Sequence, residues 1–588
     1  MTNLHDPREA LRPLFRTALQ AAFGPEFADE DPILRSSTHA DLQANLAMGF
    51  ARRLKMQPRA VGEAIAAALP RNEVLARVEV AGPGFLNLTL ADGWITAAAT
   101  AMLQDPRFGV PCATRPERVV IDYSAPNVAK EMHVGHLRST VIGDALARLL
   151  SFRGHEVIRQ NHVGDWGTPF GMLIEHLLDR GEAEASAELG VGELSSFYKA
   201  ARRKFDGDPG FADRARNRVV KLQSGDPETL RLWSILVQLS HRYFSEVYRR
   251  LDVTLTPDDI KGESFYNSLL APLCDELEKQ GKATINQDAL CLFPPGFVNR
   301  DKEPLPLMIR KKDGGFGYAT TDLAAIRHRI EDLKATRLLY VVGAPQEQHL
   351  AMVFAAAREL GWLVPPIRAE HVKFGSVLGT DKRMFKTRQG DAVRLVDLID
   401  EAVEAAQREV RENCKEVDDE ETIRELSRSV GVGAIKFADL SCDRIKDYVF
   451  DLDRMVRFEG RTGGYVQYAH ARIQSIFRKT EKELGALVFA QGLSLSSDSS
   501  ERQAERALML RLLGFREAVE AVENTLQPHL LCTFLLDTAE AFSTFYQQCP
   551  VKNAAPERRA VRLSLCKLTA GVLATGLSLL GIQAPPRM

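Results

Sequence analysis

RVVIDYSAPNVAKEMHVGHLRSTVIGDALARLL, residues 118–150, contains a short apolar run, a polar loop and a long helical repeat. The apolar run at 119–123 is typical of a buried parallel strand. Apolar residues recur every fourth position through 137–150, which predicts one broad apolar helix face. Gly154 ends this helix, and residues 156–163 predict a second strand. Strand, helix and strand within about 45 residues predict a right-handed parallel βαβ unit.

Three domains are predicted around this unit. Residues 1–112 predict a small N-terminal α+β domain, with a helical repeat at 42–69 broken near Pro58 and two strand-like segments, 74–80 and 85–90. Residues 113–395 predict an α/β domain with a parallel, Rossmann-like sheet, interrupted at about 180–262 by a helical insertion; further strands are predicted at 289–293, 305–310 and 338–342, and a helix at 320–330. Residues 396–588 predict an all-α domain with a Ser-rich loop at 494–500.

Composition excludes several classes of protein. The 588 residues are 45% hydrophobic and 26% charged, which excludes collagen, coiled coils and wholesale disorder. The net charge of -2 disfavours a basic chromatin-type binder, although a local basic stripe could still bind nucleic acid. Eight cysteines without a C-x-x-C pair indicate neither a redox motif nor a Cys-rich zinc site, and fit a reducing cytosol.

Two terminal segments bear on localisation. The N-terminus has no basic region followed by an apolar run, so no secretory signal is predicted. Residues 568–586 carry no charge, and we interpret them as a buried terminal helix rather than a membrane span. The chain is therefore predicted to be cytoplasmic, without a membrane partner.

His133-Val134-Gly135-His136 stands at the start of the predicted helix, after the first parallel strand. A helix N-terminus attracts phosphate, and two histidines three apart in its first turn can reach the same oxygens. Gly135 leaves room for a flat base to approach the backbone. The alternative is a histidine pair that caps the helix or binds metal. Ligands of open parallel sheets bind at the carboxyl ends of the strands, which favours the phosphate site.

Several longer motifs resemble class I aminoacyl-tRNA synthetases, specifically the arginyl-tRNA synthetase family. The resemblance covers essentially the whole chain and rests on motifs in the family's order: LQAN at 42–45, GPGFLNL at 82–88, DYSAPNVAK at 122–130, HVGHLRST at 133–140, NHVGDWG at 161–167, GTDKRMFKTR at 379–388 and YVQYAHAR at 465–472. It implies an arginine–tRNA ligase. Such an enzyme makes arginyl-adenylate from L-arginine and ATP, then transfers arginine to the 3′-terminal ribose of tRNA(Arg).

The resemblance implies an ATP site formed by His133, Gly135, His136, Met384, Phe385 and Lys386. Residues 383–387 align with the family's Lys-Met-Ser-Lys-Ser loop, in which Lys386 is the second lysine and would follow the pyrophosphate. Arg383 replaces the first lysine, and we hypothesise that Lys130 supplies the missing charge. Mg²⁺ would arrive with ATP, and neither a metal site of the protein's own nor a permanent cofactor is predicted.

An arginine pocket must pair a planar guanidinium with carboxylates. Tyr318 and Asp322 lie four apart and share a helix face, although a pair at a helix start is the plainer interpretation. By resemblance, the guanidinium would bind Asp322 and Glu263 beside Tyr318, and the polar end of the amino acid would bind Asn127, His133 and Gln346. Gln348 is an alternative to Gln346. A pocket of this kind rejects other side chains strongly, so no editing domain is required.

Anticodon contacts are predicted in the all-α domain, where cations alternate with aromatic residues: Arg461, Tyr468, Arg472, Arg478 and Lys479. A second basic cluster is predicted near Tyr546, from Lys552, Arg558, Arg559 and Arg562. A solvated helix face over core aromatics is the alternative at each single position. The surface should show an acidic pocket within a basic rim.

The sequence is also compatible with two other functions. A small-molecule nucleotidylyltransferase also uses an H-x-G-H turn on a Rossmann-like sheet, but such enzymes are short and lack a large helical tail. The second is a tRNA-binding paralogue that has lost activation. Arg383 favours this alternative, whereas the presence of His133, His136, Lys386 and Asp322 argues against it. A monomer is the default expectation.

Overall fold

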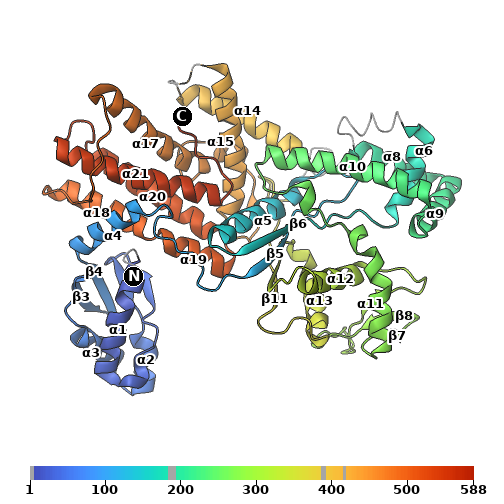
Figure 1. Cartoon of the computed structure of the whole chain (residues 1–588), viewed down its shortest axis with the longest axis horizontal. Helices are drawn as coiled ribbons and strands as arrows, with labels where there is room; N and C mark the ends of the chain where they lie inside the picture. Colours follow the sequence, from blue (N-terminus) through green and yellow to red (C-terminus); the bar gives the residue numbers. More distant parts are fainter. Residues whose placement is uncertain (1–5, 183–193, 386–392, 415–416, 418) are drawn as a thin grey trace.

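The computed structural model describes residues 6–182, 194–385, 393–414, 417 and 419–588. Figure 1 shows an N-terminal unit beneath a helical C-terminal unit at one end, a parallel sheet in the middle, and a helical insertion at the other end. The fold class predicted from the sequence, a Rossmann-like α/β domain with a small α+β domain and an all-α domain, is confirmed.

The N-terminal unit packs helices on one antiparallel sheet of order β1-β2-β4-β3. The predicted helix at 42–69 begins instead as a strand, and then forms two helices that separate before Pro58, where proline occupies the first helical position. The elements are α1 (Pro7–Phe23), η1 (Pro25–Phe27), β1 (Leu34–Ser36), β2 (Leu42–Ala44), α2 (Ala47–Leu54), α3 (Pro58–Ala68), β3 (Leu75–Ala81), β4 (Phe85–Leu90) and α4 (Asp92–Gln104).

The βαβ unit forms as predicted, from β5 (Arg118–Asp122), α5 (Val134–Phe152) and β6 (Glu156–Gln160). The central sheet is parallel throughout, with the order β11-β10-β5-β6. Its other strands are β10 (Arg337–Tyr340) and β11 (Arg368–His371). β11 was not predicted, because its sequence Arg-Ala-Glu-His has no apolar pattern.

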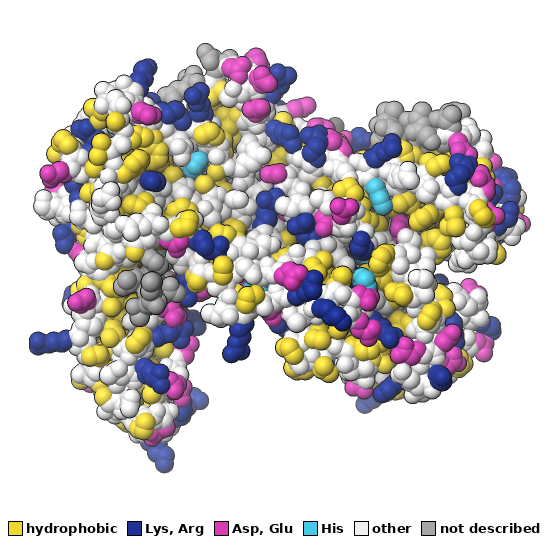
Figure 2. Space-filling view, viewed as in Figure 1, with side chains coloured by type: hydrophobic (Ala, Val, Ile, Leu, Met, Phe, Trp, Pro, Cys, Tyr) yellow, Lys and Arg dark blue, Asp and Glu magenta, His cyan; other side chains and the backbone are white. Residues whose placement is uncertain are grey.

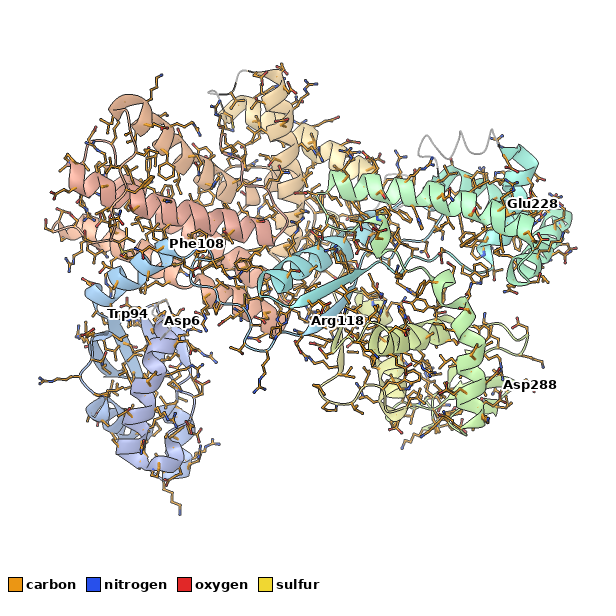
Figure 3. The ribbon with its side chains drawn as sticks, viewed as in Figure 1. Asp6, Trp94, Phe108, Arg118, Glu228 and Asp288 are labelled. Atoms are coloured by element: carbon orange, nitrogen blue, oxygen red, sulfur yellow. The ribbon has the colours of Figure 1, made fainter. Side chains whose placement is uncertain are left out.

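Two predicted strands lie outside the parallel sheet. β8 (Ala289–Leu292) and β9 (Leu307–Arg310) pair antiparallel with each other, and β7 (Thr284–Asn286) completes their separate sheet. Parallel neighbours need a crossover connection, whereas the segment between these strands contains no helix, so they pair antiparallel. α11 (Asn267–Lys279) and α12 (Tyr318–Glu331) pack beside this small sheet; Asp288 at its β7–β8 turn is labelled in Figure 3.

The insertion is helical, as predicted. It comprises α6 (Pro169–Arg180), α8 (Leu194–Gly207), α9 (Pro209–Gln223) and α10 (Pro227–Arg250). Glu228 in the first turn of α10 lies far from the sheet in Figure 3, and the helix runs back towards the sheet from there. α10 therefore connects the outer end of the insertion to the loops of the parallel sheet.

From Leu395 the chain is almost entirely helical, as predicted. The elements are α14 (Leu395–Asn413), α15 (Glu420–Leu440), α16 (Leu452–Met455), α17 (Gly463–Leu484), α18 (Ser499–Leu513), α19 (Phe515–Thr525), α20 (His529–Gln548) and α21 (Pro556–Leu579). α21 is apolar and long enough to cross a membrane, but 78% of its most apolar window is buried inside the protein. That burial agrees with the predicted terminal core helix. Phe108, labelled in Figure 3, packs against Gly571 of α21.

Gly143 allows α5 to approach the sheet closely. A Cβ at this position would lie 2.3 Å from two atoms of the buried Tyr123 side chain. We expect Gly143→Ala to destabilise the protein by about 1–3 kcal/mol through overpacking, in spite of the better helix propensity of alanine. Thermal unfolding followed by scanning fluorimetry tests this. Gly93→Ala in α4, where a Cβ has open space, is the matched control and should be neutral or slightly stabilising; equal behaviour of the two variants would contradict the close contact.

Candidate active site

The candidate site lies at the carboxyl edge of the parallel sheet, where the loops after β5, β6, β10 and β11 meet. Isolated bridges connect these loops: Asn127 pairs with Gly164, and Gly343 pairs with Phe374. The edge where parallel strands end is the usual ligand site of open α/β sheets. The HVGH, NHVGDWG and GAPQ segments of the sequence all lie there.

His133 and His136 form a reciprocal cap at the start of α5. Nδ1 of His133 accepts a hydrogen bond from the backbone N–H of Gly135 at 3.0 Å, and Nδ1 of His136 accepts one from the N–H of His133 at 3.1 Å. Burial, followed by repulsion from Lys130, lowers the pKa of His133. Burial, with repulsion from His133, lowers the pKa of His136 to about 3. Both rings are therefore neutral near pH 7, and each keeps its proton on Nε2.

Because Nδ1 of each histidine is occupied by the backbone, both Nε2–H groups remain as donors for a ligand. The capping alternative and the phosphate-binding function are thus compatible, since they use different ring nitrogens. The loop ahead of the cap contains Ser124, Ala125 and Ala129 in left-handed conformation, with φ of 74°, 45° and 58°. Non-glycine residues hold such conformations only where their surroundings enforce them.

Helix α10 of the insertion holds this loop in place through hydrogen bonds. The Tyr248 hydroxyl lies 2.8 Å from Oγ of Ser124 and accepts a hydrogen bond from Nδ2 of Asn161 at 2.9 Å. Oγ of Ser240 accepts a hydrogen bond from the N–H of Ala129 at 2.9 Å. Nε1 of Trp233 donates to the Asp165 carbonyl at 2.8 Å. The insertion therefore fixes the loops after β5 and β6.

Three carboxylates converge beside these loops. Asp165 accepts hydrogen bonds from the N–H of Ser264 at 2.8 Å and from its hydroxyl at 2.7 Å, which fixes the short helix η3 (Glu263–Tyr266). Burial raises the pKa of Asp165. Burial, then repulsion from Asp165 and Asp322, raises the pKa of Glu263 to about 7. Glu263 and Asp322 are 59 positions apart in sequence, yet Asp322 contributes to the raised pKa of Glu263, so the fold brings the two carboxylates near each other. That they bind a guanidinium stays a prediction.

Two residues of this pocket had no predicted role. Asp165 fixes the Glu263 segment, and a carboxylate in the loop after β6 is the signal that could have identified it. Nε2 of His349, in the first turn of α13 (Glu347–Glu359), lies 2.6 Å from Oδ2 of Asp322. Its position after β10 is the corresponding signal, but a lone histidine carries little information in a sequence.

The other predicted arginine ligands are less enclosed. Tyr318 begins α12 one turn before Asp322, and is 75% exposed. Gln346 is exposed at the end of η4 (Ala344–Gln346), immediately before α13. Asn127 is exposed, with Oδ1 packed so closely over Gly164 that a Cβ there would lie 2.3 Å away. All three stand at the carboxyl edge, and their contacts with a ligand stay a prediction.

The predicted signature loop is anchored at both ends. Before it, β12 (Val377–Leu378) pairs with β13 (Tyr448–Val449), and the Phe385 ring stacks on Phe450 with centroids 5.2 Å apart. After it, the N–H of Val134 donates to the Val393 carbonyl at 3.0 Å, directly beside His133. Lys386 lies outside the described residues. The segment that follows it nevertheless reaches the capped start of α5, where Arg394 bridges to His133.

Arg383 and Met384 are exposed within this anchored segment. Met384 bridges to Leu378, and the N–H of Arg383 donates to Asp381 at 3.0 Å. A cavity of about 690 Å³ adjoins the segment and is lined by Gly379, Thr380, Asp381, Arg383, Met384, Phe385 and Phe450. Lys130, proposed to complement Arg383, places Nζ 4.3 Å from the centroid of the Tyr198 ring of α8 and repels both histidines.

The predicted anticodon residues lie on α17, except Arg461, which stands just before it. The Arg472 guanidinium lies 4.7 Å from the Tyr468 ring and 5.5 Å from the Tyr546 ring, and Tyr468 stacks on Phe458. Arg461 forms ion pairs with Asp537 and Glu540 of α20. Further along α17, Nη1 of Arg478 donates to the Pro586 carbonyl at 2.7 Å, and Lys479 is exposed nearby. The Tyr468–Arg472 pair has the aromatic and cationic character of a base-stacking surface.

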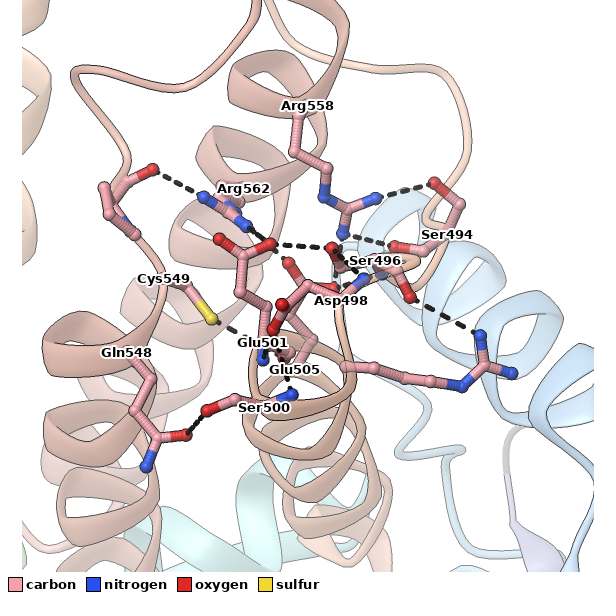
Figure 4. A network of polar contacts seen from close by, with 12 residues as sticks. Ser494, Ser496, Asp498, Ser500, Glu501, Glu505, Gln548, Cys549, Arg558 and Arg562 are labelled. Carbon is pink, nitrogen blue, oxygen red and sulfur yellow. Dashed lines mark hydrogen bonds and ion pairs between the residues drawn. The ribbon is translucent and has the colours of Figure 1, made fainter.

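The second predicted basic cluster is wrong for Arg558 and Arg562. Figure 4 shows both guanidinium groups turned inwards onto Glu505, which is fully buried, and Arg562 also pairs with Glu501. A buried carboxylate requires cationic partners, so these arginines stabilise the contact between α18 and α21. Tyr546, which was assigned to this cluster, contacts Arg472 instead.

Charge is distributed in small patches. On the face seen in Figure 2, Lys and Arg side chains alternate with Asp and Glu. A continuous basic band of the kind expected around an acidic pocket is not seen on this face. Within the described ranges, no group of three or more His, Cys, Asp and Glu side chains is arranged to hold a metal ion.

Comparison with known protein families matches each of the three predicted domains. The class I (R) tRNA synthetase catalytic domain matches residues 98–452, the DALR anticodon binding domain 466–588, and the arginyl tRNA synthetase N terminal domain 9–90. A parallel sheet with a histidine-capped helix at its carboxyl edge, followed by this helical domain, defines a class I aminoacyl-tRNA synthetase.

Relatives specify the family within that class. The arginine–tRNA ligase of Thermobifida fusca is 53% identical over 99% of this chain and all of its own length, and that of Nostoc punctiforme is 45% identical over 99% of both. The chain belongs to the arginyl-tRNA synthetase family. Among solved structures, the arginyl-tRNA synthetases of Plasmodium falciparum (28% identity) and Thermus thermophilus (26%) superpose with TM-scores of 0.82 and 0.80, each over 99% of this chain and at least 99% of their own.

Proposed function

We propose that the carboxyl-edge site activates L-arginine with ATP and that the bound tRNA(Arg) then receives arginine on its terminal ribose. The observation that carries this proposal is the interaction of the Glu263 carboxylate with Asp165 and Asp322, together with the neutral histidine cap at the start of α5. A pocket with clustered carboxylates suits a guanidinium, whose five N–H donors need fixed acceptors. A helix N-terminus with two free N–H donors suits a phosphate.

In this mechanism the protein positions the reactants and stabilises charge. Asp322 and Glu263 would bind the guanidinium beside Tyr318, while Asn127, His133 and Gln346 would hold the other end of the amino acid. The arginine carboxylate then attacks the α-phosphate, and pyrophosphate leaves. Nε2–H of His133 and of His136 would donate to the α-phosphate as charge accumulates there, and Lys386 would follow the leaving pyrophosphate. Gly135, Met384 and Phe385 complete the proposed ATP site.

The remaining features follow from the same proposal. Mg²⁺ would be bound through the ATP phosphates, since the described carboxylates serve arginine and form no metal cage of their own. We propose a cytoplasmic monomer. Residues 1–112 and 396–588 would bind the tRNA on either side of the catalytic domain 113–395, with Arg461, Tyr468, Arg472, Arg478 and Lys479 at the anticodon.

The direct experiment is aminoacylation of total tRNA with each of the twenty amino acids. Transfer of arginine alone supports the proposal. Adenylylation of a small molecule without tRNA would instead support a nucleotidylyltransferase, and tRNA binding without transfer would support an inactive paralogue.

The raised pKa of Glu263 predicts a pH-dependent affinity for arginine. Only the carboxylate form accepts the guanidinium, and in the free enzyme this form is lost as the pH falls through about 7. We expect this protonation of Glu263 to raise the KM for arginine by up to about tenfold per pH unit below 7, while kcat at saturating arginine changes less. Steady-state aminoacylation between pH 5.5 and 8.5 measures both. Glu263→Gln should abolish this contribution, and a KM that is flat across the range would contradict it.

Lys130 is expected to assist pyrophosphate release. Lys130→Ala removes a cation that acts on both cap histidines and should lower ATP–pyrophosphate exchange, measured with tRNA present, by about tenfold. Lys130→Arg keeps the charge and should retain most of the exchange. An unchanged exchange rate in Lys130→Ala would show that Lys130 does not supply the charge of the lysine that Arg383 replaces.

A further inference from the structure

The contact between His349 and Asp322 joins two elements of the arginine pocket. Asp322 lies in the second turn of α12, and His349 lies in the first turn of α13, which follows a different strand. Nε2 of the histidine is 2.6 Å from Oδ2 of the carboxylate, and their side chains are 30% and 21% exposed. The bond is therefore short and largely enclosed, in contrast to an ordinary surface pair.

A carboxylate that binds a guanidinium must present its oxygens in a fixed plane. A free aspartate rotates about χ2, which has a broad and roughly two-fold preference, so orientation has to come from a neighbour. A neutral histidine with its proton on Nε2 supplies one donor in a fixed direction and leaves the aspartate charged. Gln346, proposed for the polar end of arginine, stands three residues before His349 at the start of the same helix.

We propose that His349 is a positioning residue for the substrate: it holds Oδ2 of Asp322 so that Oδ1 and the carboxylate plane face the guanidinium. This inference rests on the proposed role of Asp322 as an arginine ligand. Arginine specificity would then depend on α13 as well as on α12 and η3. The start of α13 would act on both ends of the amino acid, through Gln346 at the polar end and through His349 at the guanidinium.

The ionisation of the pair has a direct consequence. The hydrogen bond to Asp322 raises the pKa of His349, so the imidazole keeps its second proton to a higher pH than a free histidine does. A protonated His349 would neutralise Asp322 and oppose the guanidinium. The other titratable groups that interact with Asp322 are Glu263 on η3, Tyr266 and Tyr340. Of these, Glu263 also titrates near pH 7, so arginine binding should release protons from Glu263 and from His349.

A purely structural role would make the His349–Asp322 bond a clamp between α12 and α13. In that case its loss would lower thermal stability and the concentration of active enzyme, but would not change the KM for arginine selectively. The alternatives therefore differ in which kinetic constant changes, and at which pH.

The experiment compares His349→Ala, His349→Gln and Asp322→Asn in the full-length enzyme, by aminoacylation at saturating ATP and tRNA. His349→Ala should raise the KM for arginine roughly tenfold, with kcat within about threefold and the KM for ATP unchanged. Gln places an amide N–H near the position of Nε2, so His349→Gln should restore a KM close to that of the unmodified enzyme at pH 8. Lys373→Ala, which removes an ion pair with Glu347 on the same turn of α13, is the control and should leave the KM unchanged.

The pH profile supplies the second measurement. If both groups lose protons on binding, log KM should fall with pH with a slope approaching about -2 below pH 7 in the unmodified enzyme, and about -1 in His349→Gln. The double variant His349→Ala/Asp322→Asn should be no worse than Asp322→Asn alone. Additive losses, or the same slope in both proteins, would overturn the role of His349. An unaffected KM in Asp322→Asn would instead refute the proposed arginine pocket itself.

Discussion

Replacing Asp322 with asparagine is expected to lower kcat/KM for arginine by roughly 10²- to 10³-fold. The substitution keeps the volume of the side chain but removes its charge, and it turns an N–H donor towards a guanidinium that offers only donors. The loss is expected mainly in the KM, since the guanidinium is remote from the reacting carboxylate and contributes similarly to ground and transition states. The carboxylate is 21% exposed, which places the effect below that of a fully buried ion pair.

Asp332 offers a matched control on the same helix. Its carboxylate also bonds a histidine, His328, at 2.7 Å, but it is exposed at the C-terminal end of α12, ten residues after Asp322. Asp332→Asn should therefore leave arginine kinetics within about twofold of the unmodified enzyme, as surface substitutions usually do. Steady-state kinetics with arginine as the varied substrate compare the two. Similar losses in both variants would show that α12 is merely sensitive to substitution.

Local sequence patterns were sufficient to predict most helices and strands of the fold. The apolar repeat of 137–150 and the run at 119–123 predicted α5 and β5 correctly, since each pattern reflects burial on one continuous element. The strand β11 could not be predicted in this way, because its four residues are mostly polar. It is a strand because it pairs with β10 in the sheet. β8 and β9 have strand character, but character alone does not say which sheet a strand joins.

Local patterns could not predict which side chains from distant parts of the sequence come together at the site. The four-residue spacing of Tyr318 and Asp322 predicted a shared helix face, yet nothing in spacing associates either with Glu263, which the family resemblance supplied. Asp165 and His349 act through other residues, so their sequence context has no signature of its own. The misassigned Arg562 illustrates the reverse error: a cation on a helix suggests RNA, until a buried carboxylate such as Glu505 is found opposite it.

Removing the imidazole of His136 is the second large effect that we expect. His136→Ala should reduce the rate of ATP–pyrophosphate exchange, measured with tRNA present, by roughly 10²- to 10³-fold, with a small change in the KM for ATP. The donor acts on charge that develops at the α-phosphate, so its loss affects the transition state more than the bound substrate. His136→Gln keeps an N–H donor of similar reach and should recover part of this rate.

The protonation state of His136 determines how the exchange rate should depend on pH. A pKa of about 3 means that His136 enters the reaction as a neutral donor with its proton on Nε2, since Nδ1 is bound to the N–H of His133. The exchange rate at saturating arginine and ATP should then stay level between pH 6.5 and 8.5. A cationic His136 would lose its proton in this range, and the rate would fall as the pH rises. Such a fall in the unmodified enzyme, absent in His136→Gln, would show that the charge and not the hydrogen bond stabilises the phosphate.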